Sequence, residues 1–307
     1  TLHYALLNKD MISLKDLNGD GKITEGADIF SKIEIKDRPM GFGEAPWLYK
    51  SKGKYYLVDA MSMPQQVAYA MADSPRGPWQ YKGVILNENR RPDGSQGDFN
   101  SDTSHPAVIE FKGQWYVFYH NAAQPTGGQS RRSVCVEKIS YNADGTIAQS
   151  FISSTGPLDG AVRIQSGRQA DQYVTFSGFD VKLDTLPADD RTFRWDVTQG
   201  LADEATPGTV SMQSVTYPGY YLTVKGDAVV LEKNDASADF RRRATFKKIP
   251  VPSDKKLTAL QSLADPSRYL RRSADTGKLT AEIITSATNN ADKSEATFKF
   301  ISDADAY

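Results

Sequence analysis

GEAPWLYKSKGKYYL, residues 43–57, places an acidic side chain beside a proline and a tryptophan, directly before a run typical of a β-strand. The Lys52-Gly53 pair between two aromatic runs predicts a β-hairpin with a two-residue turn. A carboxyl group beside Pro46 and Trp47 is expected to lose hydration, which raises its pKa towards that of a proton donor at neutral pH. Glu44 is therefore a candidate general acid, and a surface glutamate in a turn is the alternative.

A second hairpin, AVIEFKGQWYVFYH, repeats the form of the first one 60 residues later (113 − 53) and turns at Lys112-Gly113. Each hairpin follows a proline, in EAP and in SHP respectively. Repeated antiparallel units of this size predict the blades of a β-propeller, with a β-sandwich as the alternative. Aromatic and β-branched runs predict the strands Leu2–Leu6, Trp47–Lys50, Lys54–Ala60, Val67–Ala72, Val108–Phe111, Trp115–His120, Ser133–Ser140 and Ile147–Phe151.

The segment DLNGDGKITEGAD, residues 16–28, has the spacing of a calcium-binding loop. Oxygen side chains at positions 1, 3 and 5 can turn inward onto a hard cation, and the glycine at position 6 allows the sharp turn. Position 12 holds Ala27 in place of an acid, so Glu25 or Asp28 would have to serve. The sequence predicts structural calcium, and a pair of tight turns with solvated acids is the alternative. The expected ligands are Asp16, Asn18, Asp20, Lys22 and Asp28.

Beyond residue 156 a threefold repeat replaces these hairpins. Three units of strand and turn signals, each ending in a Thr-Phe pair, cannot bury their own apolar faces, which predicts closure around a threefold axis as a β-trefoil. The spacing is 48 residues in both steps (212 − 164 and 260 − 212). It relates Ile164-Gln165-Ser166, Met212-Gln213-Ser214 and Leu260-Gln261-Ser262, then Tyr173, Tyr221 and Tyr269, and then Leu183, Leu231 and Leu279.

Composition limits the classes of function. The 307 residues include 37 Lys and Arg against 38 Asp and Glu, so no basic excess indicates a nucleic-acid partner. No run approaches the roughly 18 apolar residues of a membrane-spanning helix. The single cysteine, Cys135, excludes an intrachain disulfide and is expected to lie buried in a strand. The length allows two domains, which we expect at residues 1–155 and 156–307.

The first half of the chain resembles the later blades of glycoside hydrolase family 43. The matching text is EAPWLYKSKGKYYLVDA, ADSPRGPWQYKGVIL, NSDTSHPAVIEFKGQWYVFYHNAA and RRSVCVEKISYNADGTI. The resemblance implies a five-bladed propeller that cleaves arabinofuranosyl or xylosyl linkages with inversion. It also implies that Glu44 is the general acid and that His105 lies near the propeller axis, where it helps to hold a cation through water.

An inverting glycosidase needs a second carboxylate, roughly 6.5–9.5 Å from the acid, to activate water on the opposite face of the sugar. In the family this base, and a third acid that tunes the pKa of the proton donor, come from blades that precede the matching text. The acids within residues 1–42 are better explained by turns or by the calcium loop. We therefore expect a second polypeptide, nicked or separate, that carries the N-terminal blades and completes the site.

Further aromatic and polar residues are candidates for contact with sugar. Trp47 offers an aromatic face. Asn100 and its polar neighbours lead into His105, and Arg131 and Arg132 carry guanidinium groups that can pair with hydroxyls or with a catalytic carboxylate. The alternatives are a polar loop around Asn100 and solvated arginines.

The second half resembles the arabinofuranosidase-B-type domain, carbohydrate-binding module family 42, most clearly over residues 214–246, SVTYPGYYLTVKGDAVVLEKNDASADFRRRATF. That trefoil family binds arabinofuranosyl side chains and typically places a His after a Tyr-Leu-Arg run and an Asp in a following turn. Phe176, Val224 and Arg272 stand at the His position here, whereas the acid is kept at Asp235. Asp235 is thus a candidate sugar contact, and a trefoil that only supports the propeller is the alternative.

These observations predict an all-β protein: the later blades of a five-bladed β-propeller followed by a C-terminal β-trefoil. The predicted function is that of a secreted inverting glycoside hydrolase, of the α-L-arabinofuranosidase or β-xylosidase type. Its expected substrate is a polysaccharide or oligosaccharide of hemicellulose that contains arabinose or xylose. A non-catalytic carbohydrate-binding or scaffold protein derived from such an enzyme is the alternative.

Overall fold

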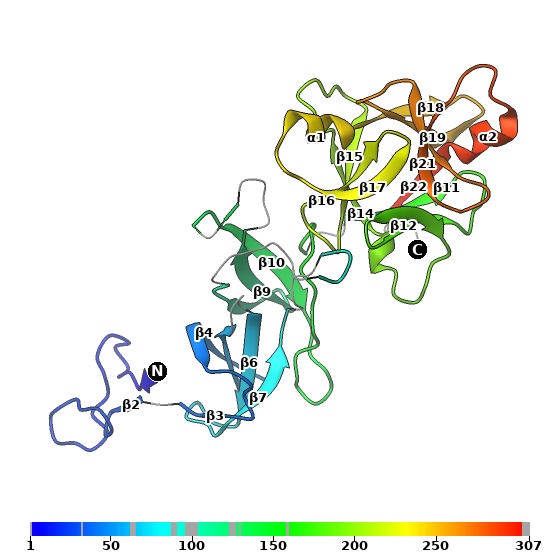
Figure 1. The fold of residues 1–307 in the computed structure, drawn as a ribbon. Helices are drawn as coiled ribbons and strands as arrows, with labels where there is room; N and C mark the ends of the chain where they lie inside the picture. Colours follow the sequence, from blue (N-terminus) through cyan, green and yellow to red (C-terminus); the bar gives the residue numbers. More distant parts are fainter. Residues whose placement is uncertain are drawn as a thin grey trace. The chain divides into compact units, whose positions relative to one another are not determined.

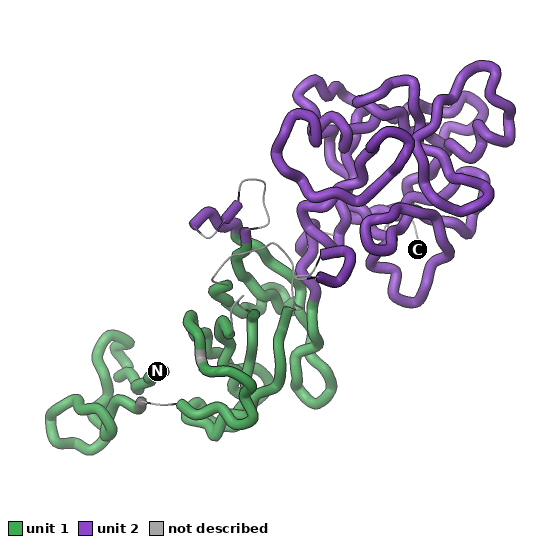
Figure 2. The backbone as a smooth tube through the Cα atoms, in the orientation of Figure 1, with its two compact units in different colours: residues 1–88, 101–121, 134–150 green, residues 89–100, 122–133, 151–307 purple. Residues whose placement is uncertain are grey.

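The computed structural model of the chain describes residues 2–31, 33–61, 66–86, 91–95, 104–122, 127–128, 130–157 and 160–302. They form two compact units (Figure 2): unit 1 comprises residues 1–88, 101–121 and 134–150, and unit 2 comprises residues 89–100, 122–133 and 151–307. Strands dominate both units (Figure 1), so the predicted all-β class is confirmed. None of the described helices is long and apolar enough to cross a membrane.

Unit 1 contains three separate sheets. Its strands are β1 His3–Ala5, β2 Ile29–Ser31, β3 Ile35–Lys36, β4 Phe42–Ser51, β5 Lys54–Met61, β6 Gln66–Ala72, β7 Trp79–Val84, β8 Ala107–Phe111, β9 Gln114–Asn121 and β10 Ser133–Ile139. The largest sheet has the order β3-β7-β6-β5-β4, the second has the order β10-β9-β8, and β1 pairs with β2. The hairpin pairs β4–β5 and β8–β9 are antiparallel, whereas β3 and β7 run parallel.

Both predicted hairpin turns are confirmed. The backbone φ angles are 45° and 85° at Lys52-Gly53, and 52° and 81° at Lys112-Gly113. Left-handed values at both central residues are what a type I′ turn requires, and its twist matches the twist of the flanking strands.

The sequence analysis is wrong about one strand of unit 1 and misses three. Over the predicted strand Ile147–Phe151, only isolated bridges occur, at Ile147 and Ser150. The missed strands β2 and β3 are three and two residues long, too short to show alternation. The third, β7, carries an irregular register beside Gly83, which breaks the alternating pattern.

The core of unit 1 lies on β5 and β6. Every side chain is buried from Tyr56 to Met61 and from Val67 to Ala72, so these strands are covered on both faces. Tyr49 of β4 stacks on Tyr56 with ring centroids 4.9 Å apart. The expectation for Cys135 holds only in part, because it lies on β10 but is half-buried; burial raises the pKa of its thiol to about 11.

Unit 2 is built on one continuous sheet. Its elements are β11 Val162–Ser166, β12 Tyr173–Ser177, β13 Asp180–Asp184, the 3-10 turn η1 Arg191–Phe193, β14 Trp195–Gln199, β15 Thr209–Ser214, β16 Tyr220–Lys225, β17 Ala228–Lys233, α1 Ala238–Arg243, β18 Phe246–Val251, β19 Asp254–Ser262, β20 Arg268–Arg272, β21 Leu279–Ile283, α2 Asn290–Glu295 and β22 Thr297–Ser302. The first and last strands, β11 and β22, pair over five residues from Val162↔Ser302 to Ser166↔Phe298. This pairing joins the two ends of the unit.

The threefold repeat of the sequence is present in the backbone of unit 2. The repeated glutamine and tyrosine face each other in every repeat, as Gln165↔Tyr173, Gln213↔Tyr221 and Gln261↔Tyr269. A turn carbonyl of each repeat also accepts an N–H from the next: Phe179 O from Leu231 at 2.9 Å, Asp227 O from Ala281 at 2.8 Å, and Gly277 O from Leu183 at 2.9 Å. These three bonds link the repeats into a closed ring.

The equivalence expected for Leu279 is wrong by two residues. The second hairpin strand supplies the core partner in each repeat, and the observed pairs are Val174↔Leu183, Leu222↔Leu231 and Leu270↔Ala281. The reason is the turn of the third repeat, which spans residues 273–278, whereas the corresponding turns of the other two repeats contain two residues. The core position therefore falls on Ala281.

Short helical turns that the sequence analysis does not predict accompany the Thr-Phe pairs of unit 2: α1 and α2 precede Thr245-Phe246 and Thr297-Phe298, whereas Thr192-Phe193 lies within η1. Ser237 begins α1, where its hydroxyl accepts the Phe240 N–H at 3.0 Å, and Asn289 begins α2, where its side chain accepts the Asp292 N–H at 2.8 Å. These are the N-cap bonds that helix ends require. A six-residue helix is too short to show the 3.6-residue periodicity by which helices are recognised in a sequence.

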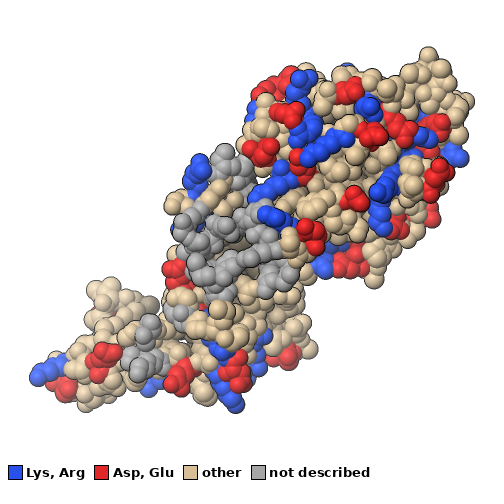
Figure 3. All heavy atoms as spheres, in the orientation of Figure 1, with Lys and Arg blue, Asp and Glu red and all other residues tan. Residues whose placement is uncertain are grey.

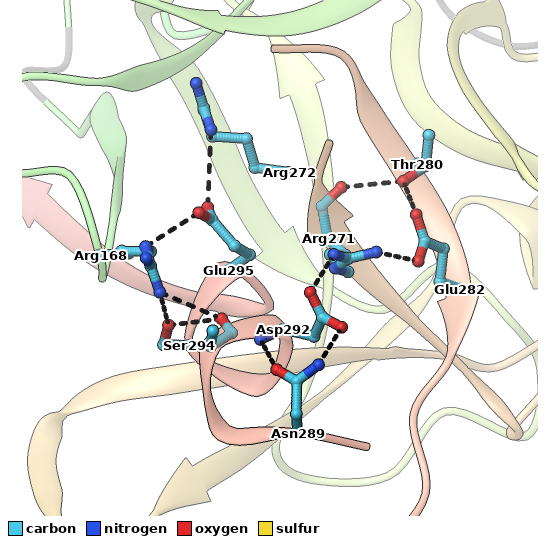
Figure 4. A network of polar contacts seen from close by, with 10 residues as sticks. Arg168, Arg271, Arg272, Thr280, Glu282, Asn289, Asp292, Ser294 and Glu295 are labelled. Carbon is cyan, nitrogen blue, oxygen red and sulfur yellow. Dashed lines mark hydrogen bonds and ion pairs between the residues drawn. The ribbon is translucent and has the colours of Figure 1, made fainter. Parts of the chain in front are cut away.

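Ion pairs tie the third repeat to the first (Figure 4). Glu295 at the end of α2 is buried, and its Oε1 lies 3.0 Å from Arg168 Nε, while its Oε2 lies 3.7 Å from Arg272 Nη1. Arg168 also donates to Ser294 Oγ at 3.0 Å. A buried carboxylate is tolerated only when it is paired, so this cluster fixes α2 on both repeats.

Charges of both signs are interspersed on the face of the molecule shown in Figure 3. This distribution agrees with the net charge of −1. Neither observation indicates a surface for nucleic acid.

Candidate active site

Two β-bulges position Glu44. β4 pairs regularly with β5 from Ser51↔Lys54 to Trp47↔Val58, but the next pairs are Glu44↔Ala60 and Phe42↔Met61. β4 therefore carries an extra residue on each side of Glu44, and Ala45 takes a left-handed φ of 57°. The sequence analysis expects Glu44 directly ahead of a strand, whereas the structure places it within β4. A bulge redirects a side chain and interrupts regular pairing.

The bulge is held by a close backbone approach and by a buried ion pair. A Cβ atom at Gly43 would lie 2.2 Å from Ala60 O, so glycine is required there. The fully buried Asp59 accepts a hydrogen bond from the Gly43 backbone. Arg38 donates to both Asp59 oxygens, Nη1 to Oδ1 at 3.0 Å and Nη2 to Oδ2 at 2.5 Å. Burial raises the pKa of Asp59, and its bonds to Arg38 oppose that rise.

Glu44 and His105 form the centre of the candidate site. Glu44 Oε1 lies 3.2 Å from His105 Nε2. The backbone N–H of His105, just ahead of β8, donates to His120 Nε2 on β9 at 3.3 Å, and the two imidazole rings meet edge to face with centroids 5.1 Å apart. The β8–β9 hairpin therefore presents a pair of histidines, the first of which faces the Glu44 carboxyl group.

This arrangement can hold one proton in two ways, as a carboxylic acid facing a neutral imidazole or as a carboxylate facing an imidazolium. Proton donation requires the first of these. The side chains of Glu44 and His105 are 43% and 46% exposed, so Pro46 and Trp47 do not by themselves remove Glu44 from water.

Trp47 links the two hairpins next to the site. Its Nε1 donates to Val108 O on β8 at 2.8 Å, so β4 of the five-stranded sheet is tied to the edge of the three-stranded sheet. The side chain is still 38% exposed. Trp47 therefore has a structural contact and keeps part of its aromatic surface accessible, as a sugar contact requires.

Three of the other predicted contact residues belong to unit 2, and Asn100 lies outside the described residues. Arg131 and Arg132 are exposed, and two backbone hydrogen bonds between Gly128 and Arg131 close the turn that precedes them. Asp235 accepts the Ser237 N–H at 2.8 Å, and hydrogen bonds from Ser237 lower the pKa of this carboxyl group.

The predicted calcium loop is closed by hydrogen bonds of its own. Asp16 accepts the N–H groups of Gly19 and Gly21, each at 2.7 Å. Asn18 accepts the Asp20 N–H at 3.1 Å, and Asp20 accepts the Lys22 N–H at 2.8 Å. Such bonds stabilise the tight turns that the sequence allows as the alternative to metal binding.

Asp28 closes the same loop from its far end. It is fully buried, and its two oxygens accept the backbone N–H groups of Leu17 at 2.7 Å and Thr24 at 3.0 Å, bonds that lower its pKa. In the described ranges no group of three or more His, Cys, Asp or Glu side chains is placed to hold a metal, His105 included. Calcium binding by this loop therefore stays a prediction.

Sequence reasoning assigns no role at the site to Arg38, Asp59 or His120. One signal for Asp59 was available, because an acid inside the apolar run YYLVDAM must be paired if the strand is buried. Its partner Arg38 is 21 residues away, and no local pattern identifies it.

The described units and site define an all-β protein in which an acid on a bulged hairpin faces an imidazole at the start of a second hairpin. Models of two known protein families match segments of this chain. Residues 3–147 match the model of Glycosyl hydrolases family 43, and residues 162–300 match that of the Alpha-L-arabinofuranosidase B (ABFB) domain. The chain thus contains a segment that matches family 43 of the glycosyl hydrolases, followed by a segment that matches the ABFB domain, in the order that the sequence analysis predicts.

Individual relatives match part of the chain. A xylosidase/arabinosidase of Bacteroides ovatus is 34% identical over 151 residues, which cover 47% of this chain and 40% of the relative. An arabinoxylan arabinofuranohydrolase of Paenibacillus polymyxa is 33% identical over 147 residues, covering 43% of this chain and 22% of the relative. The chain therefore spans less than half the length of these relatives.

A solved structure is also similar to part of the chain. It is a β-xylosidase/α-arabinofuranosidase from a compost microbial metagenome, in complex with xylotriose, and is 36% identical over 36% of this chain and 31% of its own. The TM-score is 0.31, too low to support an argument about the fold.

Proposed function

We propose that this chain is part of an inverting glycoside hydrolase that cleaves arabinofuranosyl or xylosyl linkages of hemicellulose, with Glu44 as the proton donor. The main support is that two bulges direct Glu44 to His105 within a segment that matches glycosyl hydrolases family 43. The substrate class follows from the names of the relatives, a xylosidase/arabinosidase and an arabinoxylan arabinofuranohydrolase.

In the proposed reaction, Glu44 gives its proton to the leaving glycosidic oxygen while a second carboxylate activates water on the opposite face of the sugar. The second carboxylate would lie roughly 6.5–9.5 Å from Glu44. A third acid would raise the pKa of Glu44 by charge repulsion and so favour the carboxylic acid facing a neutral His105. We assign both acids to an N-terminal segment or partner chain outside this sequence.

The same proposal assigns unit 1 to the later blades of a five-bladed β-propeller and unit 2 to a β-trefoil. The two antiparallel hairpins of unit 1, β4–β5 with its bulges and the regular β8–β9, suit successive blades. The ring of equivalent hydrogen bonds between three repeats suits a trefoil. Because its substrates are plant polysaccharides, we also propose an extracellular location.

Native mass spectrometry of the protein isolated from its source, compared with a denaturing mass spectrum, tests for the second polypeptide. We expect an additional chain, and hydrolysis of nitrophenyl arabinofuranoside or xyloside by the complex but not by this chain alone. Full turnover by the isolated chain would contradict the assignment of both acids to another segment. A complex with no turnover on either substrate would instead favour a carbohydrate-binding or scaffold protein.

Calcium binding by the loop of residues 16–28 is a separate proposal, and calorimetric titration tests it. Binding should be lost in Asp16→Ala, whose carboxylate stands at the first ligand position. Asp10→Ala is the control, because Asp10 is an exposed acid outside the loop that accepts backbone hydrogen bonds from Ile12 and Ser13. No heat with the unmodified chain would contradict the proposal.

A further inference from the structure

A groove in unit 2 lies where the three repeats differ from one another. It is an open groove with a volume of about 430 Å³, between the β12–β13 turn of the first repeat and the β16–β17 hairpin of the second. Its walls include the aromatic rings of Phe179 and Tyr220 and the charged side chains of Lys225, Glu232 and Lys233. Arg91, from outside the repeats, adds a further cation to the wall.

Phe179 is an unusual residue for its place in the fold. It provides the turn carbonyl that binds the next repeat, and the residues that provide the same carbonyl elsewhere are Asp227 and Gly277. A large apolar side chain in a turn leaves apolar area in contact with water, which is unfavourable for the free energy of folding. Phe179 is 38% exposed, and its ring lies beside Tyr220 with centroids 6.3 Å apart. The turn itself therefore does not explain this choice of residue.

The lysines of the groove are specific to the second repeat. Lys225 ends β16 beside the hairpin turn, where the first repeat has Ser177. Lys233 pairs with Tyr220 at the other end of the hairpin, where the third repeat has Ile283. The positions that the repeats share form the core, whereas these differing positions line one groove.

The charges of the groove favour an anion. Glu232 is the one acid among its lining residues, and it already binds Lys225 at 2.7 Å and Arg243 at 3.1 Å. Three cations thus face a single acid whose charge is shared by two basic groups. Lys233 and Arg91 already have contacts within the protein. A ligand carboxylate would accept further, charge-assisted hydrogen bonds from these two side chains.

We propose that this groove binds a carboxylated sugar, namely a uronic acid residue. The apolar face of the sugar ring would lie against Phe179 and Tyr220, and its carboxylate would point to Lys225 and Lys233. Aromatic rings suit the CH groups of a sugar, and ammonium groups suit its carboxylate. The choice of a sugar rests on the proposed function, whereas the aromatic and charged character of the site does not.

Isothermal titration of the full chain with D-glucuronate, D-glucose and acetate tests the proposal. D-glucose has the same ring without the carboxylate, and acetate has the carboxylate without the ring. We expect glucuronate to bind at least about tenfold more tightly than either, since each loses one of the two contacts. Equal binding of glucose and glucuronate, or binding of inorganic phosphate as tight as that of glucuronate, would overturn the proposal.

Matched variants locate the binding. Phe179→Ser and Lys233→Met should each weaken glucuronate binding by about fivefold or more, whereas Leu186→Ser and Lys256→Met, exposed residues outside the groove, should leave it unchanged. Lys233→Met keeps the Lys225–Glu232 pair, so folding of the hairpin is preserved. Glu44→Gln should not change binding, which separates this proposal from the hydrolase. Unchanged affinity in both groove variants would overturn it.

Discussion

Units 1 and 2 bury their apolar side chains to different extents. Among the described residues, ten large apolar side chains of unit 1 are at least 38% exposed, and only three of unit 2 are, although unit 2 is the larger. The three are Phe179, Leu186 and Ile283, whereas the unit 1 set includes Leu48 on β4, Ile109 and Phe111 on β8, and Val134 on β10. Unit 2 is closed by its own strands, and unit 1 leaves apolar strand surface uncovered.

This difference matters for function, because the candidate active site lies in the unit with the more exposed apolar surface. Exposed apolar strand surface is a liability for association unless another segment covers it. Glu44 and His105 are likewise nearly half exposed. One additional segment would cover this surface, desolvate Glu44 and supply the missing carboxylates, as the proposed function requires.

The largest effect on stability is expected when the buried acid of unit 1, Asp59, loses its partner Arg38. Arg38→Met leaves Asp59 buried without its guanidinium, which should lower the free energy of unfolding of unit 1 by about 3–5 kcal/mol. Hydrogen exchange measured by mass spectrometry should show the loss in β4 and β5 and none in unit 2. Arg242→Met, which removes the exposed partner of Glu204, should cost less than about 1 kcal/mol.

The loss of stability in Arg38→Met should also depend on pH. Burial raises the pKa of Asp59, and without Arg38 only the hydrogen bond from the Gly43 backbone opposes that rise. A folded-state pKa above the unfolded value means that stability is fully present below the unfolded pKa, about 4, and is lost as pH rises through the folded pKa. Arg38→Met should therefore be more defective at pH 8 than at pH 4. An equal defect at both values would contradict this account of Asp59.

A smaller effect is expected from filling the close approach beside Glu44. Gly43→Ala places a Cβ atom 2.2 Å from Ala60 O, so the bulge must shift, at a cost of about 1–3 kcal/mol. NMR should show altered His105 ring resonances, because Glu44 moves with the bulge. Gly41→Ala is the control, since its Cβ would meet nothing within 4 Å. Unchanged His105 signals in Gly43→Ala would show that the bulge does not position Glu44.

A similar test in unit 2 addresses its closure. Glu295→Ala removes the buried partner of Arg168 and Arg272 and should destabilise unit 2 by about 2 kcal/mol, less than a fully buried pair because Arg168 is 44% exposed. Unit 1 should be unaffected when the two units are followed separately by hydrogen exchange. A loss confined to unit 1 would contradict the division into two units.

The smallest effect on stability is expected at the uncovered surface. Leu48→Ser and Phe111→Ser should change the free energy of unfolding of the isolated chain by less than about 0.5 kcal/mol, because these side chains are 50% and 57% exposed. They should nevertheless reduce aggregation and weaken binding of a second polypeptide, as measured by light scattering and native mass spectrometry. Ile283→Ser, at 57% exposure in unit 2, should change neither.

The sequence predicts those features of the molecule that depend on neighbouring residues. The turns at Lys52-Gly53 and Lys112-Gly113 follow from local backbone preferences, and the repeat spacing follows from identical units. The bulge around Glu44 could not be predicted in the same way, because it depends on the approach of Gly43 to Ala60 on another strand. The shift from Leu279 to Ala281 depends on the length of one turn.

The candidate site shows the same division. The sequence analysis names both Glu44 and His105, because each lies next to a predicted hairpin. The structure places their side chains 3.2 Å apart. Arg38 and Asp59 escaped prediction because ion pairs between distant segments leave no spacing pattern. The calcium loop was predicted from spacing alone, whereas the backbone bonds of Asp28 to Leu17 and Thr24 depend on how the loop folds back.

The dependence of turnover on the leaving group tests the role of Glu44 most directly. In the complete enzyme, Glu44→Gln should reduce hydrolysis of xylo- or arabino-oligosaccharides by about 10²–10⁴-fold, because their leaving alcohols need a proton. The dinitrophenolate of a dinitrophenyl glycoside leaves without protonation, so hydrolysis of this substrate should fall by less than about tenfold. Equal losses on both substrates, or full turnover of oligosaccharides, would contradict the assignment of Glu44 as the proton donor.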